Sequence, residues 1–200
     1  MSALGRRFCL AGGVAAVAVA IFPPLSGIAA QLFAAHMLQH LLLIAVAAPL
    51  LAAGLRLSPP PVTAWIAFVA TFLFWHWPTA FQWAAANELT ALFELASILL
   101  AAFVFWSGAF ADDRLSHGAR ALFVMTAAVA TDLPGVVMLF APRAICVMPG
   151  ENAPAFGITP LEDQQIAGLL MWVPANLVFF AIATWLFALW ISPPRKLVTS

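Results

Sequence analysis

Three histidines stand where their spacing and surroundings would allow them to bind a metal ion. His36 and His40 are four residues apart in an apolar stretch that predicts a helix, so both imidazoles share one face of it. Gln39 flanks that face, whereas Met37 points about 100° away from it. The third imidazole stands in the segment Trp75-His76-Trp77-Pro78. Imidazole suits copper, zinc and iron, and a thioether would favour Cu(I).

Acidic side chains gather at the same expected depth as these histidines. Glu88 begins the fourth apolar stretch of the chain, and Glu94 follows it by about one and a half helical turns. Ionisable groups inside a membrane are costly and are therefore candidates for function. The sequence thus predicts a metal site whose candidate ligands are His36, His40 and His76, with Glu94 and Met37 as additional donors.

Structural alternatives stand beside each of these roles. The two histidines on one face could hydrogen-bond a neighbouring helix, and His76 between two tryptophans could anchor the chain at the membrane interface. Pairing with a histidine, rather than with metal, is the favoured interpretation of Glu94. Asp132 precedes Leu133-Pro134, and we expect it to satisfy backbone groups that a proline kink frees.

The elements that must position these residues are transmembrane helices. Of the 200 residues 64% are hydrophobic and only 8% are charged, whereas a soluble domain carries about 25% charge. We therefore expect an all-α, polytopic transmembrane bundle, with the lipid bilayer around it and a single domain over residues 1–200. Eight basic and eight acidic residues cancel, which argues against nucleic acid as a partner. The six predicted helices cover 8–29, 32–55, 61–77, 89–108, 119–141 and 165–191.

The basic residues predict the orientation of this bundle. Seven of the eight Lys and Arg residues fall on one side of the predicted topology: Arg6, Arg7, Arg56, Arg114, Arg120, Arg195 and Lys196. Only Arg143 falls on the other side. The positive-inside rule therefore predicts that both termini are cytoplasmic and that the loops around 78–88 and 142–164 face outward. Alternatively, Arg6-Arg7 and the apolar stretch after them could be a cleaved signal peptide, which would leave five helices.

Several enzyme classes find no support in this sequence. It contains no HExxH, CxxC or GxSxG motif and no glycine-rich phosphate loop. No stretch outside the predicted helices is long enough for a soluble catalytic domain. We therefore expect a protein that is not an enzyme.

Three motifs resemble those of one family. Phe33-Ala34-Ala35-His36-Met37-Leu38-Gln39-His40, with Ala48-Pro49 and Ala53-Gly54 after it, looks like the signature of the CtaG family of polytopic cytochrome c oxidase assembly factors. Phe74-Trp75-His76-Trp77-Pro78 resembles its Trp-His-x-Pro segment, and residues 159–174 resemble its last motif. The matching residues are Gln39, Pro49, Gly54, Trp75, Pro78, Glu162, Asp163, Gln164, Gln165, Gly168, Met171 and Trp172. One departure is that Glu94 stands where family members often carry a histidine.

The resemblance implies a role in maturing a haem–copper oxidase in the plasma (inner) membrane of a bacterium, with oxidase subunits as partners. It also implies help in forming a copper centre, so copper is the expected metal. A different class stays open: a haem-binding membrane redox protein, in which His36 or His40 would pair with His76 as axial ligands. An ion transporter has less support, because the other half of each predicted helix is almost entirely apolar.

Overall fold

The computed structural model describes residues 2–111 and 115–192, and every regular element among them is helical. Pro23 and Pro24 follow the first long helix, and Pro78 begins a short one, because proline suits the first turn of a helix but not its interior. The elements are α1 (Ala3–Ile21), α2 (Leu25–Ala29), α3 (Phe33–Leu41), a π-helical segment (Leu42–Ala47), α4 (Ala48–Leu55), α5 (Pro61–Trp75), α6 (Pro78–Ala85), α7 (Glu88–Ala111), α8 (His117–Phe140), a 3₁₀ turn (Ala153–Phe156) and α9 (Pro160–Ile191).

Five of the described helical segments are long and apolar enough to cross a membrane. They are α1, the continuous run from α3 to α4, α7, α8 and α9. A sixth crossing results if α5 and α6, which are bent by 75° relative to each other, count as one broken span. The prediction of a polytopic helical bundle with about six helices is therefore confirmed.

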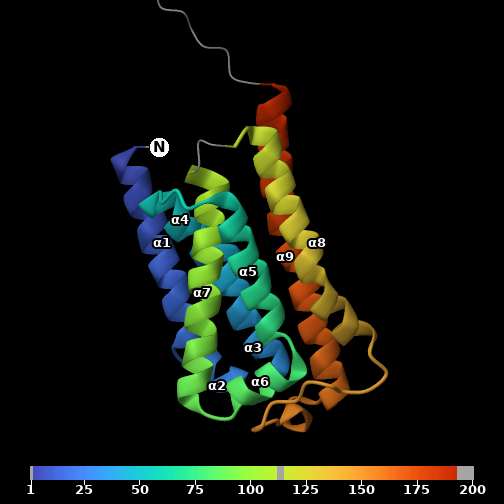
Figure 1. The fold of residues 1–200 in the computed structure, drawn as a ribbon. Helices are drawn as coiled ribbons and strands as arrows, with labels where there is room; N and C mark the ends of the chain where they lie inside the picture. Colours follow the sequence, from blue (N-terminus) through green and yellow to red (C-terminus); the bar gives the residue numbers. More distant parts are fainter. Residues whose placement is uncertain (1, 112–114, 193–200) are drawn as a thin grey trace, which may run out of the picture.

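The two ends of the described chain lie at the same end of the bundle, as Figure 1 shows. We call this the terminus end; the opposite end, formed by α2, α6 and the loop 141–159, is the distal end. Arg6, Arg7, Arg56 and Arg120 lie at the terminus end, and Arg143 lies in the distal loop. Arg114, Arg195 and Lys196 lie outside the described residues. Which end faces the cytoplasm stays a prediction of the positive-inside rule.

Several predicted helix boundaries were wrong. The first helix begins at Ala3 rather than residue 8, because Ser2 accepts a hydrogen bond from the Gly5 amide and caps it. It ends at Ile21, and residues 25–29 form the separate helix α2. The third predicted helix stops at Trp75, and the expected loop after it contains α6. The last helix begins at Pro160 rather than 165, because Thr159 and Glu162 form a capping box.

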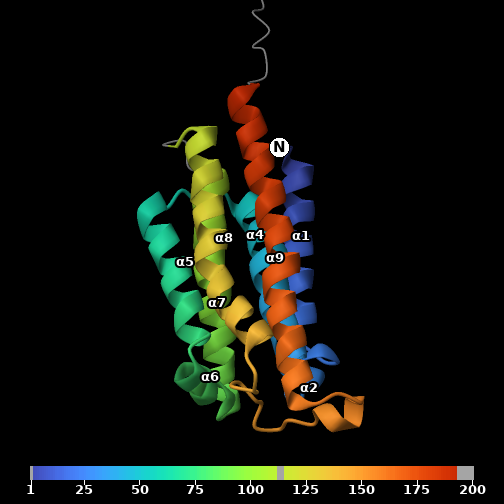
Figure 2. The same ribbon diagram turned by 90° about the vertical axis from the view of Figure 1, so that its right-hand side faces the viewer.

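The last two helices, α8 and α9, form an antiparallel pair that stands beside the other helices (Figures 1 and 2). Gly135 and Gly168 lie where the two backbones approach each other most tightly. A Cβ atom on Gly168 would lie 2.6 Å from the carbonyl oxygen of Gly135. Small residues allow the two backbones to approach closely. In a lipid bilayer, where no hydrophobic effect holds helices together, this close contact gives the van der Waals attraction that does.

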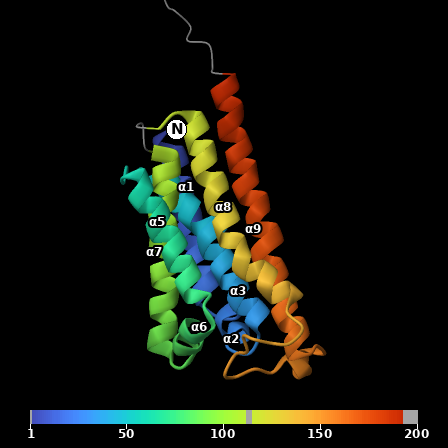
Figure 3. The same cartoon turned by 45° about the vertical axis from the view of Figure 1, so that its right-hand side comes forward.

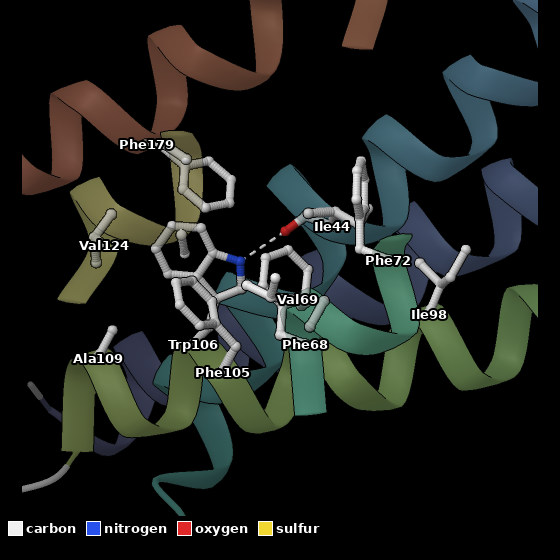
Figure 4. Packing of buried hydrophobic residues seen from close by; sticks show 14 of the residues in the cluster. Ile44, Phe68, Val69, Phe72, Ile98, Phe105, Trp106, Ala109, Val124 and Phe179 are labelled. Carbon is white, nitrogen blue, oxygen red and sulfur yellow. Dashed lines mark hydrogen bonds between the residues drawn. The ribbon is translucent and has the colours of Figure 1, made fainter. Parts of the chain in front are cut away.

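The main core lies between α3–α4, α5, α7, α8 and α9 (Figures 3 and 4). Phe68, Phe105 and Phe179 stack in it, with ring centroids 4.7 Å apart for the first two and 5.9 Å for the last two. The Trp106 indole N–H donates to the Ile44 carbonyl at 2.7 Å. That carbonyl belongs to the π-helical segment just before Pro49, where proline cannot donate an amide to the preceding turn. In this core the Trp106 indole and the Ile44 carbonyl therefore satisfy each other.

Candidate metal centre

The first two candidate ligands come from α3, close to the distal end of the bundle. Their predicted placement on one helix face is confirmed, since the ring centroids of His36 and His40 are 4.6 Å apart. Both side chains are buried, with exposed fractions of 6% and 2%. The i, i+4 spacing therefore delivers two imidazoles to one place in the protein interior.

Glu94 of α7 completes a cluster of three donors. Its Oε1 lies 3.4 Å from His36 Nε2 and 3.5 Å from His40 Nε2. The predicted pairing of Glu94 with a histidine is thus confirmed, and the carboxylate faces two imidazoles rather than one. Two donors at about 2.0–2.1 Å from a metal in tetrahedral geometry are separated by about 3.3 Å. The observed spacings fit such a donor set, and one donor atom from each residue lies within 4.8 Å of the others.

His76 lies beside this cluster in the break between α5 and α6. Its ring meets that of His40 edge to face, with centroids 5.4 Å apart, and stacks on Phe72. His76 Nδ1 lies 2.7 Å from the Phe72 carbonyl oxygen. A carbonyl only accepts, so this contact places the proton on Nδ1 and leaves the Nε2 lone pair available. Metal-binding histidines commonly have this second hydrogen bond.

The cluster holds most of the buried polar atoms that lack a partner among the described residues. These atoms are both ring nitrogens of His40, Nε2 of His76 and Oε2 of Glu94, together with the hydroxyl of Ser107. Ser107 stands 13 residues after Glu94 on α7, about 20 Å along the helix. Burying polar groups without partners costs free energy, and such groups are rare in proteins. Their convergence at one point suits a site that is completed by a cation.

Met37, the additional donor, lies in a sulfur-rich cluster. It packs with Met138, Cys146 and Met148 around Phe33 and Phe81. Burial raises the pKa of the Cys146 thiol to about 11, so this group is a neutral thiol at physiological pH rather than a metal-binding thiolate. Packing therefore accounts for these side chains, and Met37 also lines the small cavity that His40 and His76 border.

Asp163 positions the helix that carries the two histidines. No side chain at Leu32 caps the start of α3. Instead, the Asp163 carboxylate reaches from α9 and accepts from the Phe33 amide at 2.7 Å and the Ala34 amide at 2.9 Å. It is 1% exposed, so these charge-assisted bonds are shielded from water. Sequence reasoning matched Asp163 to a motif but missed this role.

Gln164 ties down the distal loop in a similar way. Its Oε1 accepts from the amides of Ile145 and Cys146, and its Nε2 donates to the carbonyl of Met138. Gln39 of α3 donates to the Ala20 carbonyl at 2.6 Å and so joins α3 to α1. These amides are structural, and each has partners.

The remaining motif residues also shape the bundle. The Trp75 indole donates to Ser97, whose hydroxyl in turn donates to the Glu94 carbonyl, so α5 and α7 are joined next to the cluster. Gly54 packs under Leu10, and its carbonyl accepts from Arg6 at 3.0 Å. The others are Pro49 and Pro78 in the first turns of α4 and α6, Glu162 in the capping box, half-buried Gln165, Gly168 at the helix crossing, and Met171 and Trp172 on α9.

The haem alternative receives no support from this geometry. A cavity does touch both His40 and His76, but its volume is only about 30 Å³. A macrocycle does not fit between these imidazoles. The described partner of Asp132 is the Asn176 amide of α9, at 2.6 Å, rather than the backbone near Pro134.

Comparison with known proteins gives one match. The family model described as cytochrome c oxidase caa3 assembly factor (Caa3_CtaG) matches residues 2–59 and 55–192, which together cover nearly the whole chain. No curated protein and no solved structure matches the chain.

Proposed function

The chain belongs to the cytochrome c oxidase caa3 assembly factor family, and from this premise we propose that it carries copper for a haem–copper oxidase. In this proposal His36, His40 and Glu94 hold one Cu(I) ion as cargo near the distal end. The protein resides in the plasma membrane of a bacterium with that end outward, as the basic residues predict. Its role is stoichiometric delivery to oxidase subunits, not catalysis.

The observation that carries the proposal is the convergence of buried donors without partners. His40 is 2% exposed and Glu94 is 1% exposed, yet neither His40 ring nitrogen nor Glu94 Oε2 has a hydrogen-bond partner. A bound cation would satisfy one ring nitrogen of each imidazole together with the Glu94 carboxylate.

The charge of the donor set also suits Cu(I) inside a membrane. Two neutral imidazoles and one carboxylate carry a single negative charge, which one Cu(I) ion would neutralise. A neutral complex avoids the cost of leaving an uncompensated charge in a medium of low dielectric constant. Imidazole nitrogen is a common copper ligand.

Three donors also leave room for transfer. A cargo site must release its ion, and an open coordination position allows a donor group from a partner to bind before the ion leaves. His76 lies next to the cluster with an available Nε2. Among the described residues, its side chain is well placed to take up such an open position.

Copper titration of the purified protein tests the proposal. We expect one Cu(I) per chain in detergent micelles, and we expect the double variant His36→Ala/His40→Ala to bind at least tenfold more weakly. His117→Ala, which changes an exposed histidine at the terminus end, is the matched control and should bind like the wild type. Equal affinity in the double variant would overturn the copper role.

A cellular experiment tests the biological side. Deletion of the gene should lower the copper content of a haem–copper oxidase, and the wild-type gene should restore it where the double variant does not. Normal copper in every such oxidase of the deletion strain would contradict the proposed role in assembly.

A further inference from the structure

A cleft at the distal end reaches the buried metal-site residues. It lies between the end of α1, α2, the start of α7 and the tip of the distal loop, and its volume is about 570 Å³. His36 and Glu94 are part of its wall. Two of the three proposed ligands therefore border open space, although each is almost completely buried by its neighbours.

The residues along the cleft suit a positive ion. Glu88 is exposed at the first turn of α7, and Glu94 lies six residues further along the same helix, about 9 Å deeper. The thioether of Met148 and the amide of Gln39 lie in the wall as well. No lysine or arginine of the described residues lines the cleft. Its field therefore attracts cations and repels anions.

The size of the cleft decides what can pass. A water molecule occupies about 30 Å³ in the liquid, so a cleft of 570 Å³ admits an ion together with its hydration shell or a small chelating molecule. The other cavity near the site, between His40 and His76, has a volume of only about 30 Å³ and is lined mainly by apolar side chains such as Phe68 and Phe72. It offers no path for a hydrated ion.

We propose that this cleft is the access path by which a small cation reaches the metal site from the distal face, with Glu88 as the first contact and Glu94 as the last. This inference rests on the proposed function, because it assigns the route by which that site is loaded. It also predicts the form in which the ion is delivered, which is a free ion or a small complex. The helices of the bundle do not need to move apart for the ion to enter.

Blocking the path should slow loading without removing the site. Ala91 is half-buried on the cleft wall, three residues after Glu88 and three residues before Glu94. Gly27 lines the opposite wall, and a Cβ atom there would meet nothing within 4 Å. Ala91→Trp and Gly27→Trp both add bulk to the cleft. Leu89→Trp is the matched control, because Leu89 is on the same helix but is 77% exposed and outside the cleft.

The uptake rate is measured by stopped flow with Cu(I)–bicinchoninate as the probe. We expect at least a tenfold slower uptake in Ala91→Trp and Gly27→Trp, with the same final stoichiometry as the wild type, and no change in Leu89→Trp. Wild-type uptake rates in both cleft variants would overturn the access path while leaving the copper site intact.

A second readout needs no metal and separates this inference from the proposed function. Ala91→Cys should react with a charged, water-soluble methanethiosulfonate reagent at least ten times faster than Ala96→Cys, which is exposed on α7 but outside the cleft. Equal rates would overturn the path whether or not copper binds. Fast reaction of Ala91→Cys in a protein that binds no Cu(I) would leave the cleft open to water but would contradict the copper site that it is proposed to serve.

Discussion

Two groups of buried polar side chains lie near the distal end of the same bundle, and they differ in how well they are satisfied. Asp163 and Gln164 of α9 use their oxygens and nitrogens on backbone groups of α3, α8 and the distal loop. His40, His76 and Glu94 keep ring nitrogens and a carboxylate oxygen without partners. Burial removes both groups from water, but only the first group replaces the lost hydrogen bonds with partners inside the protein.

We infer from this difference that the first group stabilises the fold and that the second group binds a ligand. A polar network with every partner in place stabilises one arrangement of helices. We propose that a bound cation completes the second group, whose polar atoms lack partners within the described chain. Substitution in the first group should therefore lower stability, and substitution in the second should remove binding while leaving stability nearly unchanged.

The largest expected effect on stability comes from Asp163. Asp163→Ala removes both acceptors at the start of α3 and leaves two amides without their partner, so we expect the free energy of unfolding to fall by about 3 kcal/mol. Chemical denaturation in detergent micelles measures it. Asp163→Asn keeps one acceptor and should lose less. Gln165→Ala, a change at the half-buried neighbour, is the control; an equal loss there would argue against a specific role for Asp163.

A somewhat smaller loss is expected at the crossing of α8 and α9. In Gly168→Ala the new methyl group would lie 2.6 Å from the Gly135 carbonyl oxygen and 2.8 Å from the Leu139 amide. Because both are backbone atoms, the helices must separate, and overpacking of this kind costs about 1–3 kcal/mol. The same denaturation experiment measures the loss. A stability equal to that of the wild type would show that the two backbones are not held so tightly.

In the group that lacks partners, formed by His40, His76 and Glu94, we expect a substitution to weaken metal binding more than it lowers stability. Glu94→Gln keeps the shape of the side chain but removes its charge, so Cu(I) affinity should fall at least tenfold while the free energy of unfolding changes by less than about 1 kcal/mol. Parallel copper titration and denaturation give both values. A large loss of stability with unchanged copper affinity would reverse the assignment of the two groups.

The smallest effect concerns the buried thiol of the distal loop. Burial raises the pKa of Cys146 from about 9 to about 11, so its contribution to stability is complete below pH 9 and is lost as the pH rises through 11. Alkylation of Cys146 by iodoacetamide at pH 8 should be slow in the folded protein and should become fast after unfolding. Rapid alkylation of the folded protein would contradict this burial.

The sequence predicted contacts between residues close together in the chain better than contacts between distant ones. The shared face of His36 and His40 follows from helical spacing alone, and it was confirmed. The role of Asp163 depends on partners 130 and 129 residues away, which no local pattern reveals. A local signal was available in one other place: Thr159-Pro160-Leu161-Glu162 is a capping box, and it would have placed the start of α9 correctly. The short helix α6 was missed because it has only eight residues and begins with Pro78, shortly after α5 ends at Trp75.

The most direct test of the central claim is X-ray absorption at the copper edge of the Cu(I)-loaded protein. We expect a first shell of nitrogen and oxygen with the multiple scattering of at least two imidazoles, and the loss of that imidazole signal in His36→Ala/His40→Ala. A first shell dominated by sulfur would place the ion in the cluster around Met37 and Met138 instead. That result would contradict the assignment of copper to His36, His40 and Glu94.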